Sequence, residues 1–339
     1  MSDVAIRAVD PLDPNQAELF ERWVEVHNAA GRSIWGDAAQ QTTPTDVRAA
    51  YRTSDQRQTA WAAVDADGRL VGAVALIEPV RENLDTAGIW LSVHPDSWRR
   101  RIGSRLLAHV EDAARAAGRS RIHQHSGAPT ASGDAPTRFA LASGYRQVLL
   151  DLRSDLKLPV PASTLEALVA EATDPAYVIE TAWDTLPEEW LEDRAMLARR
   201  MSTDAPMGDI DLDEEVWDCD RVRDQWARGR AAGRRALESV ARHIGSGRLV
   251  AYSDAMVMEG QPDLAIQSDT LVLKEHRGHR LGLAVKLANV RALQDELPAV
   301  TTVRTWNAES NTHMLAVNQA MGFFVTGYTR EWTKALSWP

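Results

Sequence analysis

The chain has 339 residues, enough for two domains of ordinary size, and 44% hydrophobic with 25% charged residues is typical of a folded globular protein. Its formal net charge of −10 argues against general binding to nucleic acids or anionic membranes, which needs a basic surface. A single cysteine, Cys219, excludes an intrachain disulfide, and no apolar run approaches the ~20 residues of a membrane span. With no N-terminal signal pattern, we expect a cytoplasmic protein.

The first half of the chain shows hydrophobic periodicity broken by turn signals, which predicts alternating strands and helices. The predicted elements, in order, are a strand over 4–9, a helix over 14–30, strands over 59–64 and 70–77, a strand over 89–93, a helix over 102–117, a strand over 121–125, a helix over 137–142 and a strand over 145–152. The turn Asp65-Ala66-Asp67-Gly68 predicts that the second and third strands form a hairpin.

Two prolines in Lys157-Leu158-Pro159-Val160-Pro161 break the regular pattern, which then restarts. We therefore expect an N-terminal domain over 1–156, a linker over 157–175 and a C-terminal domain over 176–339. The predicted elements of the second domain are a strand over 178–181, a helix over 188–201, an acidic loop over 202–215, a helix over 216–233, strands over 236–243 and 249–256, a strand over 265–272, a helix over 281–294, a strand over 300–305, a helix over 311–321 and final strands over 325–335.

Two short stretches, 93–107 and 272–286, are similar to each other at an offset of 179 residues. Each runs from an apolar strand through a basic turn into an amphipathic helix. Arginines at a helix N-terminus oppose the helix dipole unless an anion is bound, whereas the free N–H groups there suit phosphate oxygens. The sequence thus predicts a tandem repeat of one fold built around an anionic ligand, with the second turn as the stronger phosphate site.

The second of these stretches resembles the signature of the GNAT superfamily of acyl-CoA-dependent N-acyltransferases, Val-x-x-x-x-(Gln/Arg)-x-x-Gly-x-(Gly/Ala). Val272, Arg277 and Gly282 match it, and Arg280 stands at the first glycine. The first stretch matches less well.

In that first stretch Val93 and Gly103 match, Trp98 replaces the Gln/Arg and Arg101 replaces the first glycine. The resemblance implies an α/β (α+β) fold of two tandem GNAT-like domains, each a mixed, mostly antiparallel sheet flanked by helices. It also implies acetyl-CoA (coenzyme A) as cofactor, with its diphosphate held at the second turn. The implied cofactor-binding residues are Leu271, Val272, Leu273, Arg277, Gly278, His279, Arg280, Leu281, Gly282, Leu283, Asn307 and Asn311.

A second family segment is similar to residues 305–323, where Asn311 could equally be a plain helix N-cap. The family often carries a tyrosine here that protonates the leaving thiolate, and this chain has Asn318, which is no general acid. Tyr328 is the nearby alternative. The first half lacks the segment, because residues 126–136 form a loop rich in Gly, Ala and Pro. We therefore assign the chemistry to the second half and expect the first to be degenerate.

Acyl transfer needs a group that removes the amine proton, and the strand before the second turn offers Asp269 as the catalytic candidate and Gln267 as a substrate contact. Asp269 could instead be a strand-edge carboxylate, and Asp254 on the preceding strand is a weaker candidate. The acidic loop, with Asp204 and Asp209 as substrate-binding candidates, would favour a cationic amine, or is simply solvated.

Together these residues predict an acetyl-CoA-dependent N-acetyltransferase with direct transfer in a ternary complex in the C-terminal domain. Its expected partner is a primary amine of a small molecule or peptide, possibly cationic, with no nucleic acid, membrane or metal, in a monomer or homodimer. Two alternatives stay open: a non-catalytic acyl-CoA-binding or sensing module, and a protein in which both domains are active.

Overall fold

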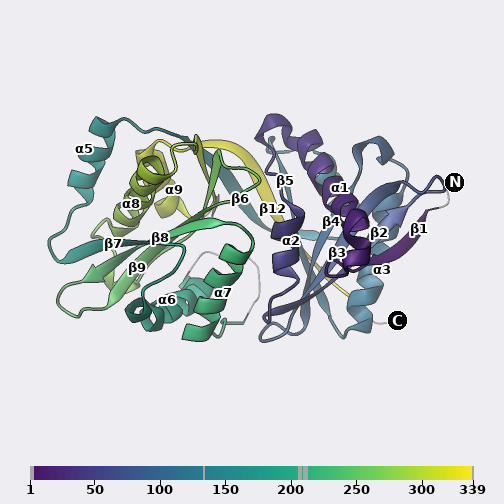
Figure 1. The fold of residues 1–339 in the computed structure, drawn as a ribbon, viewed down its shortest axis with the longest axis horizontal. Coiled ribbons are helices and arrows are strands. Elements are labelled where there is room, and N and C mark those ends of the chain that lie inside the picture. The colour runs from purple at the N-terminus through teal and green to yellow at the C-terminus, as the bar shows by residue number, and fades with distance from the viewer. Residues whose placement is uncertain (1–3, 133, 205–207, 209–212, 338–339) are drawn as a thin grey trace. The chain divides into compact units, whose positions relative to one another are not determined.

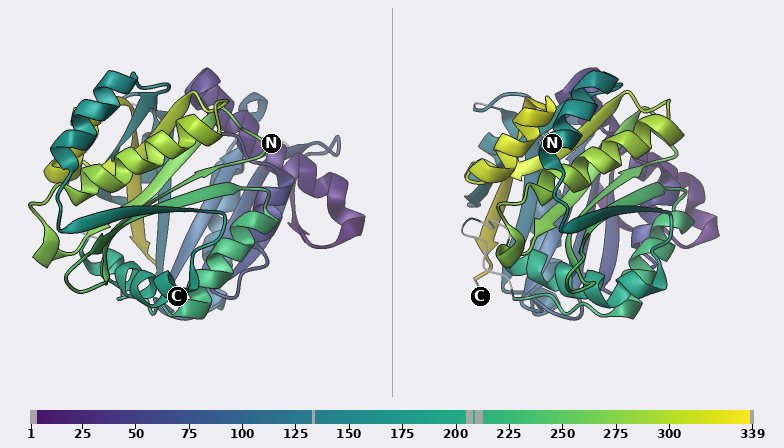
Figure 2. Two further views of the ribbon diagram at one scale, coloured as in Figure 1. Left: turned by 60° about the vertical axis from the view of Figure 1, so that its left-hand side comes forward. Right: turned by 90° about the vertical axis from the view of Figure 1, so that its left-hand side faces the viewer.

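The computed structural model describes residues 4–132, 134–204, 208 and 213–337 (Figures 1 and 2). Its contacts divide the chain into two compact units. Unit 1 comprises Met1–Leu150, Asp209–Asp213 and Tyr328–Pro339, and unit 2 comprises Asp151–Gly208 and Glu214–Gly327. Each unit is described by itself below.

Unit 1 is built on a sheet of order β1-β2-β3-β4-β5-β12, in which β4 and β5 are parallel and the other described pairs antiparallel. Its elements are β1 (Ala5–Val9), α1 (Ala17–Trp35), α2 (Pro44–Ala50), β2 (Gln56–Val64), β3 (Leu70–Pro79), β4 (Thr86–Val93), α3 (Ile102–Ala116), β5 (Arg121–Ala128), α4 (Ala135–Ala142) and the Tyr328–Ala335 part of β12 (Phe324–Ala335).

Two hydrophobic cores lie on the two faces of this sheet, because successive strand side chains alternate between faces. On one face α1 buries Phe20 and Trp23 against β2 and β3. On the other face α3 buries Leu106 and Val110. Gly72 of β3 lets α3 approach closely, since a Cβ there would lie 2.7 Å from Leu106 Cδ1. The mixed, helix-flanked sheet predicted from the sequence is confirmed here.

Unit 2 repeats this plan with sheet order β6-β11-β10-β9-β8-β7, in which β10 and β11 are parallel. Its elements are the Asp151–Lys157 part of β6 (Arg146–Lys157), α5 (Ala162–Ala172), β7 (Tyr177–Trp183), α6 (Leu191–Asp204), α7 (Cys219–Ala231), β8 (Arg235–His243), β9 (Leu249–Val257), β10 (Leu264–Val272), α8 (Leu281–Glu296), β11 (Thr302–Ala308) and α9 (Thr312–Met321).

The region 157–175, expected to be a linker, contains helix α5. Leu165, Leu168 and Ala172 recur at helical spacing and pack on the core formed with α8. The acidic loop expected over 202–215 is described only at its ends, where α6 continues to Asp204.

The last strand of each half pairs within the unit of the other half. Residues Asp151–Lys157 of β6 pair with β11 in unit 2, and Tyr328–Ala335 of β12 pair with β5 in unit 1. In each unit, the strand that pairs with the second strand of the parallel pair therefore comes from the other half of the repeat.

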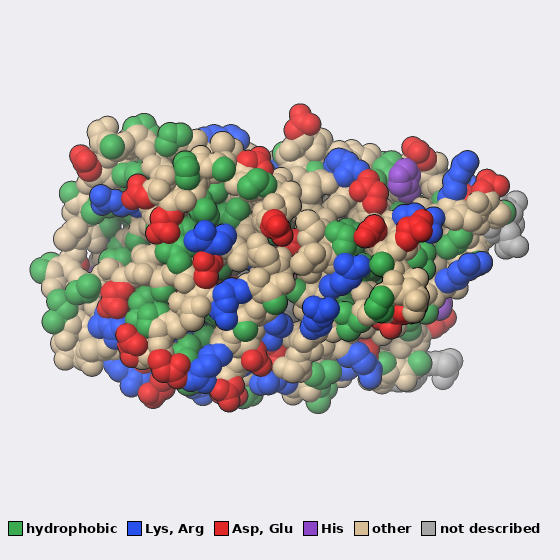
Figure 3. Space-filling view, viewed as in Figure 1, with side chains coloured by type: hydrophobic (Ala, Val, Ile, Leu, Met, Phe, Trp, Pro, Cys, Tyr) green, Lys and Arg blue, Asp and Glu red, His purple; other side chains and the backbone are tan. Residues whose placement is uncertain are grey.

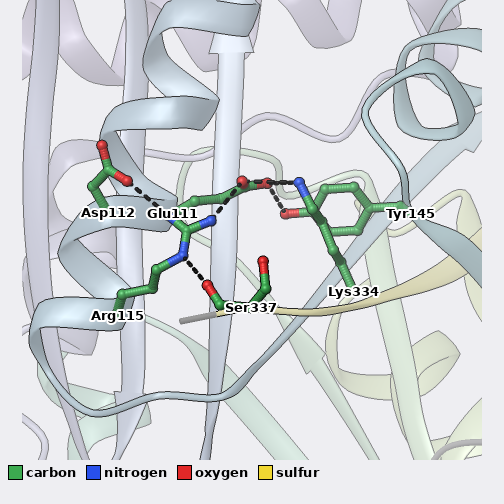
Figure 4. A network of polar contacts seen from close by, with 6 residues as sticks. All are labelled: Glu111, Asp112, Arg115, Tyr145, Lys334 and Ser337. Atoms are coloured by element: carbon green, nitrogen blue, oxygen red, sulfur yellow. Dashed lines mark hydrogen bonds and ion pairs between the residues drawn. The ribbon is translucent and has the colours of Figure 1, made fainter. Parts of the chain in front are cut away.

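A network of polar contacts attaches the exchanged C-terminal segment to unit 1 (Figure 4). Lys334 Nζ lies 2.8 Å from Glu111 Oε1, and Tyr145 Oη donates a hydrogen bond of 3.1 Å to the same oxygen. Arg115 on α3 donates to the Ser337 carbonyl at 3.2 Å. Because the Glu111 carboxylate is buried, these partners are what make its burial tolerable.

Candidate active site

The parallel strand pair of each unit separates soon after it forms. In unit 1, β4 and β5 pair only over Thr86–Gly88 and Arg121–His123. In unit 2, β10 and β11 pair only over Leu264–Ile266 and Thr302–Arg304. Beyond these residues β5 and β11 stay bonded to the exchanged strands, so a wedge-shaped gap opens toward the basic turn in each unit.

Both basic turns have the same unusual backbone. Arg101 and Arg280, the residues before α3 and α8, are left-handed with φ of 62° and 55°. Two residues earlier, Arg99 and Gly278 have φ of 64° and 90°. Such conformations point successive N–H groups into one concavity that suits an anion. Neither helix has a side-chain N-cap or a first-turn acid, so these N–H groups remain available.

The two departures from the family signature have a structural explanation. Arg101 and Arg280 adopt the left-handed conformation that the first glycine otherwise supplies. Trp98 also substitutes for the usual Gln/Arg: its Nε1 donates to the Val93 carbonyl at 2.7 Å. In the second turn, Arg277 Nε donates at 3.3 Å to the carbonyl of Val272. In both turns the acceptor is the residue five positions earlier in the chain. The first turn is therefore an intact copy of the second.

A cavity of about 900 Å³ lies in unit 1 at the gap between β4 and β5. Its walls are the end of β4, the basic turn, the first turn of α3 and the start of α4. Asp134 is the one carboxylate among its described lining residues, and it already caps α4 (2.7 Å to Thr137 N) and pairs with Arg330 at 3.3 Å. The cavity can hold an elongated ligand, but it offers no uncommitted carboxylate.

His27 also lies near this cavity, with its Nδ1 2.9 Å from the hydroxyl of Ser92, which lines it. Burial lowers the pKa of His27 to about 3, so the imidazole is neutral at physiological pH. It stacks on Trp90, with ring centroids 3.7 Å apart. A base this weak contributes little to deprotonating an amine.

Charge differs between the two turns. The side chains of Arg99, Arg100 and Arg101 make no hydrogen bond or ion pair with any residue that the structure describes. In the second turn, Arg280 pairs with Glu171 of α5, Lys274 Nζ lies 3.4 Å from Asp204 and His279 Nδ1 lies 2.7 Å from Asp174, whereas Arg277 donates to the Val272 carbonyl. This distribution favours stronger anion binding at the first turn, the reverse of the order that the signature suggested.

Removing one arginine from each turn tests this ranking. We expect Arg101→Gly, which keeps the left-handed backbone, to weaken coenzyme A binding about 5-fold, because one unpaired charge is lost. Arg280→Gly should have a smaller effect, since that guanidinium already has a partner. Calorimetric titration with coenzyme A measures both. Equal losses in the two variants, or a larger loss in Arg280→Gly, contradict the ranking.

Unit 2 holds a cluster of charged side chains that unit 1 lacks at the equivalent described positions. Strand β10 bulges between Gln267 and Thr270, beside the gap. At the bulge, the Asp269 amide donates to Asp254 Oδ1 of β9 at 3.0 Å, and Tyr252 Oη donates to Asp269 Oδ2 at 3.3 Å. A carboxyl pair thus sits beside interrupted strand pairing.

The cluster continues inward from β9. Arg194 of α6 donates to the buried Glu238 of β8 at 2.7 Å, and its guanidinium lies 3.6 Å from the Tyr252 ring. Burial, and then the charges of Asp269 and Glu238, raise the pKa of Asp254 to about 8, against the opposing effect of Arg194. Asp254 therefore exchanges its proton close to neutral pH, as a general base must.

Asp254 was the weaker candidate from the sequence, and the structure gives it a raised pKa. Its pKa depends on groups contributed by β8, β10 and α6, which no local pattern relates. Of the residues preferred from the sequence, Asp269 is exposed and contacts Asp254 through its amide, whereas Gln267 is buried and donates to Ser253 Oγ at 2.9 Å.

The other predicted site residues differ in their exposure to solvent. Leu271, Leu273, Leu281 and Leu283 are buried core residues, whereas the side chains of Arg277, His279 and Arg280 are exposed, as is Gly278. Gly282 has room for a Cβ, which would lie 3.7 Å from Cγ2 of the half-buried Val272. The rest come from the family segment, the acidic loop and β12.

Asn311 caps α9 by accepting from Met314 N at 3.2 Å, and Asn307 accepts from Asn318 Nδ2 at 2.6 Å. Asp204 is committed to Lys274. Asp209 lies outside the described residues. Tyr328 belongs to unit 1, on β12 opposite Ala128, whereas Asp269 belongs to unit 2.

Comparisons with known proteins agree with this geometry. The sequence model of the acetyltransferase (GNAT) family matches residues 20–131. The solved structure of a tandem GNAT protein from the clavulanic acid biosynthesis pathway, determined without acetyl-CoA, matches with a TM-score of 0.81 and 26% identity, over 99% of this chain and 100% of that one. Residues 20–131 match the GNAT family, and the fold of the whole chain is that of a tandem GNAT protein.

More distant structures show the same fold. A GCN5-related N-acetyltransferase from Sphaerobacter thermophilus matches with a TM-score of 0.66 and 17% identity, over 98% of this chain and 96% of that one. A glucosamine N-acetyltransferase region of a fungal multi-domain GH3 beta-N-acetylglucosaminidase matches with a TM-score of 0.68 and 16% identity, over 98% of this chain and 38% of that one. No curated protein matches the chain in a sequence comparison.

The family match runs from α1 through β5, in the half that the sequence predicted to be degenerate. Across the described residues, no helix is long and apolar enough to cross a membrane, and no group of three or more His, Cys, Asp or Glu is arranged to hold a metal. Basic and acidic side chains are interspersed on the face shown in Figure 3.

Proposed function

We propose that the protein is an acetyl-CoA-dependent N-acetyltransferase that acetylates a primary amine of a small molecule or peptide by direct transfer, with the chemistry in unit 2. One observation carries the proposal: Asp254, whose pKa burial raises to about 8, lies beside the β10 bulge where the strands begin to separate. When bound, acetyl-CoA supplies an activated acetyl thioester.

Each part of unit 2 has a task in this proposal. The N–H groups of the turn ending at Gly282 bind the diphosphate, and the acyl group lies beside the β10 bulge between Gln267 and Thr270. Asp254 takes the proton from the attacking amine. The carboxylates of Asp269 and Glu238 nearby favour an acceptor that arrives as a cation. We place this activity in the cytoplasm.

A panel of primary amines, with release of the coenzyme thiol as the signal, tests this proposal. We expect at least one cationic amine to increase thiol release well above the rate with water alone, with formation of the N-acetyl product confirmed by mass spectrometry. The panel contains aromatic amines such as tyramine, polyamines and amino sugars. Each amine is compared with a neutral compound of the same shape as its control. Bound acetyl-CoA without transfer to any amine would leave the non-catalytic alternative standing instead.

Unit 1 supports a second role, the binding of an acyl-CoA without transfer. Its 900 Å³ cavity suits the ligand, as do Arg99, Arg100 and Arg101, whose side chains pair with none of the described residues, but His27 is too weak a base and Asp134 is committed to other groups. We expect calorimetry to give two coenzyme sites per chain, of which the tighter is weakened about 5-fold in Arg101→Gly. If a substitution in unit 1 instead abolishes acetyl transfer, the result favours the alternative in which both domains are active.

A further inference from the structure

The chain uses lysine rarely. Of 38 lysines and arginines only four are lysine: Lys157, Lys274, Lys286 and Lys334. Lys286, on α8 of unit 2, is 1% exposed and among the largest fully buried side chains. Arginine cannot lose its proton in a protein, whereas lysine can when it is buried. This chain, which otherwise uses arginine, thus has a lysine at a buried position, where the side chain loses its proton most easily.

No acid accompanies this amine. Lys286 Nζ lies 5.2 Å from the centre of the Phe323 ring and makes no hydrogen bond or ion pair with a residue that the structure describes. Burial lowers the pKa of Lys286 to about 7, and no charged group on the elements packed against α8 adds to this effect. Near neutral pH the amine therefore both holds and releases a proton.

The position of Lys286 follows from the contact between α8 and α9. A Cβ on Gly282 would lie 4.0 Å from Met314 Cε, so these two residues face each other. One helical turn further along each helix come Lys286 and Asn318, which consequently face the same space between the helices. Phe323 connects them, since its ring lies under Lys286 Nζ and its amide donates to the Asn318 carbonyl at 3.0 Å.

Asn318 stands where the family segment often has its tyrosine acid. It is 2% exposed, its Nδ2 donates to Asn307, and its Oδ1 has no hydrogen-bond partner among the described residues. An amide cannot protonate a thiolate. The space beside Asn318 therefore lacks the expected proton donor, and Lys286 is the titratable side chain that faces it.

We propose that Lys286 is the proton donor to the sulfur of the departing coenzyme. This inference rests on the proposed function of unit 2. As the amine nitrogen bonds to the acetyl carbon, the carbon–sulfur bond breaks and its electron pair stays on sulfur. The Lys286 ammonium gives one proton to that sulfur, and Asp254 takes one from the new amide nitrogen. Proton return from Asp254 or water to the neutral amine restores the starting state.

Nuclear magnetic resonance of protein labelled with ¹³C at the lysine ε carbons tests this directly on the folded chain. Four lysines give four signals, which single Lys→Arg variants assign. We expect Lys286 to titrate near pH 7. The probes are coenzyme A and desulfo-coenzyme A, which lacks only the sulfur atom.

Lys274, in the second turn, reports occupation of that turn, and Lys286 reports contact with sulfur. The inference requires that coenzyme A shift both signals and raise the pKa of Lys286, and that desulfo-coenzyme A shift Lys274 alone. A response of Lys274 without a sulfur-dependent response of Lys286 overturns the inference and leaves the proposed function intact. If neither signal responds to saturating coenzyme A, the proposed function of unit 2 fails as well.

The kinetic consequence is separate from this binding test. Lys286→Met keeps the apolar volume but cannot donate a proton, so we expect kcat to fall about 10²-fold while KM for acetyl-CoA changes little. The fall in rate on the alkaline side of the profile should disappear in this variant. Lys157→Met, in the same unit, is the matched control and should keep the wild-type pH profile. A wild-type profile in Lys286→Met contradicts the assignment.

Discussion

Asp254→Asn lowers kcat for amine acetylation by about 10²–10³-fold, because general-base catalysis by a positioned group contributes at this scale and asparagine accepts no proton. The substitution keeps the size of the side chain and an oxygen that can accept from the Asp269 amide, so the β10 bulge is retained. Steady-state kinetics with the best amine of the panel measures the loss. Asp134→Asn in unit 1 serves as the control outside the proposed centre.

The pH profile separates a base from a structural residue. With a base of pKa about 8 and an acid of pKa about 7, the wild-type rate is bell-shaped, with its maximum between these values. Asp254→Asn should abolish the decrease on the acidic side and keep the one on the alkaline side. If Asp254→Asn lowers the rate but keeps the bell-shaped pH profile, Asp254 has a structural role only.

Stability gives an independent check on the same group. Folding raises the pKa of Asp254 from 3.8 to about 8, so the folded state binds its proton more tightly than the unfolded state does. The stability from this group is fully present below about pH 4 and is lost as the pH rises through about 8. Asp254→Asn should therefore raise the melting temperature more at pH 9 than at pH 5.

Asp155→Asn destabilises unit 2 by about 3–5 kcal/mol, since it leaves the buried guanidinium of Arg304 without its counter-ion. Arg304 Nε and Nη2 lie 2.8 and 2.9 Å from the two Asp155 oxygens, and both side chains are almost fully buried. The pair joins the exchanged strand β6 to β11 at the register position where β11 also leaves β10. Urea unfolding at pH 7 measures the change.

Two variants control this second prediction. Arg235→Gln breaks the exposed pair with Asp184 and should cost less than about 1 kcal/mol. The double change Asp155→Leu with Arg304→Met removes both charges and should recover much of the lost stability. A single Asp155→Asn that costs as little as Arg235→Gln would show that the pair does not hold β6 in place.

The same pair has a predictable pH dependence. Burial by itself would raise the pKa of Asp155, but the hydrogen bonds and charge of Arg304, with Arg153, hold it below its usual 3.8. A lowered pKa means that the stability is present above about pH 4 and is lost as the pH falls through the folded value. Its pH dependence is thus opposite to that of Asp254.

The sequence determined the features that depend on neighbours along the chain. The repeated turns at 93–103 and 272–282 and most strand and helix boundaries follow from local periodicity, capping residues and glycine positions. Helix α2 was missed because its seven residues show too little periodicity. The signature predicted a phosphate turn in both halves, and the left-handed Arg101 and Arg280 explain how both turns keep the same backbone without the first glycine.

Tertiary structure alone decided the rest, because those properties arise between residues far apart in the sequence. The exchange of β6 and β12 depends on pairing with β11 and β5, and a strand pattern does not name its partner. The pKa of Asp254 is set by groups from other strands and a helix, and that of Lys286 by burial between α8 and its neighbours. Burial and charge proximity are properties of the folded chain, and they moved the proposed chemistry from Asp269 and Tyr328 to Asp254 and Lys286.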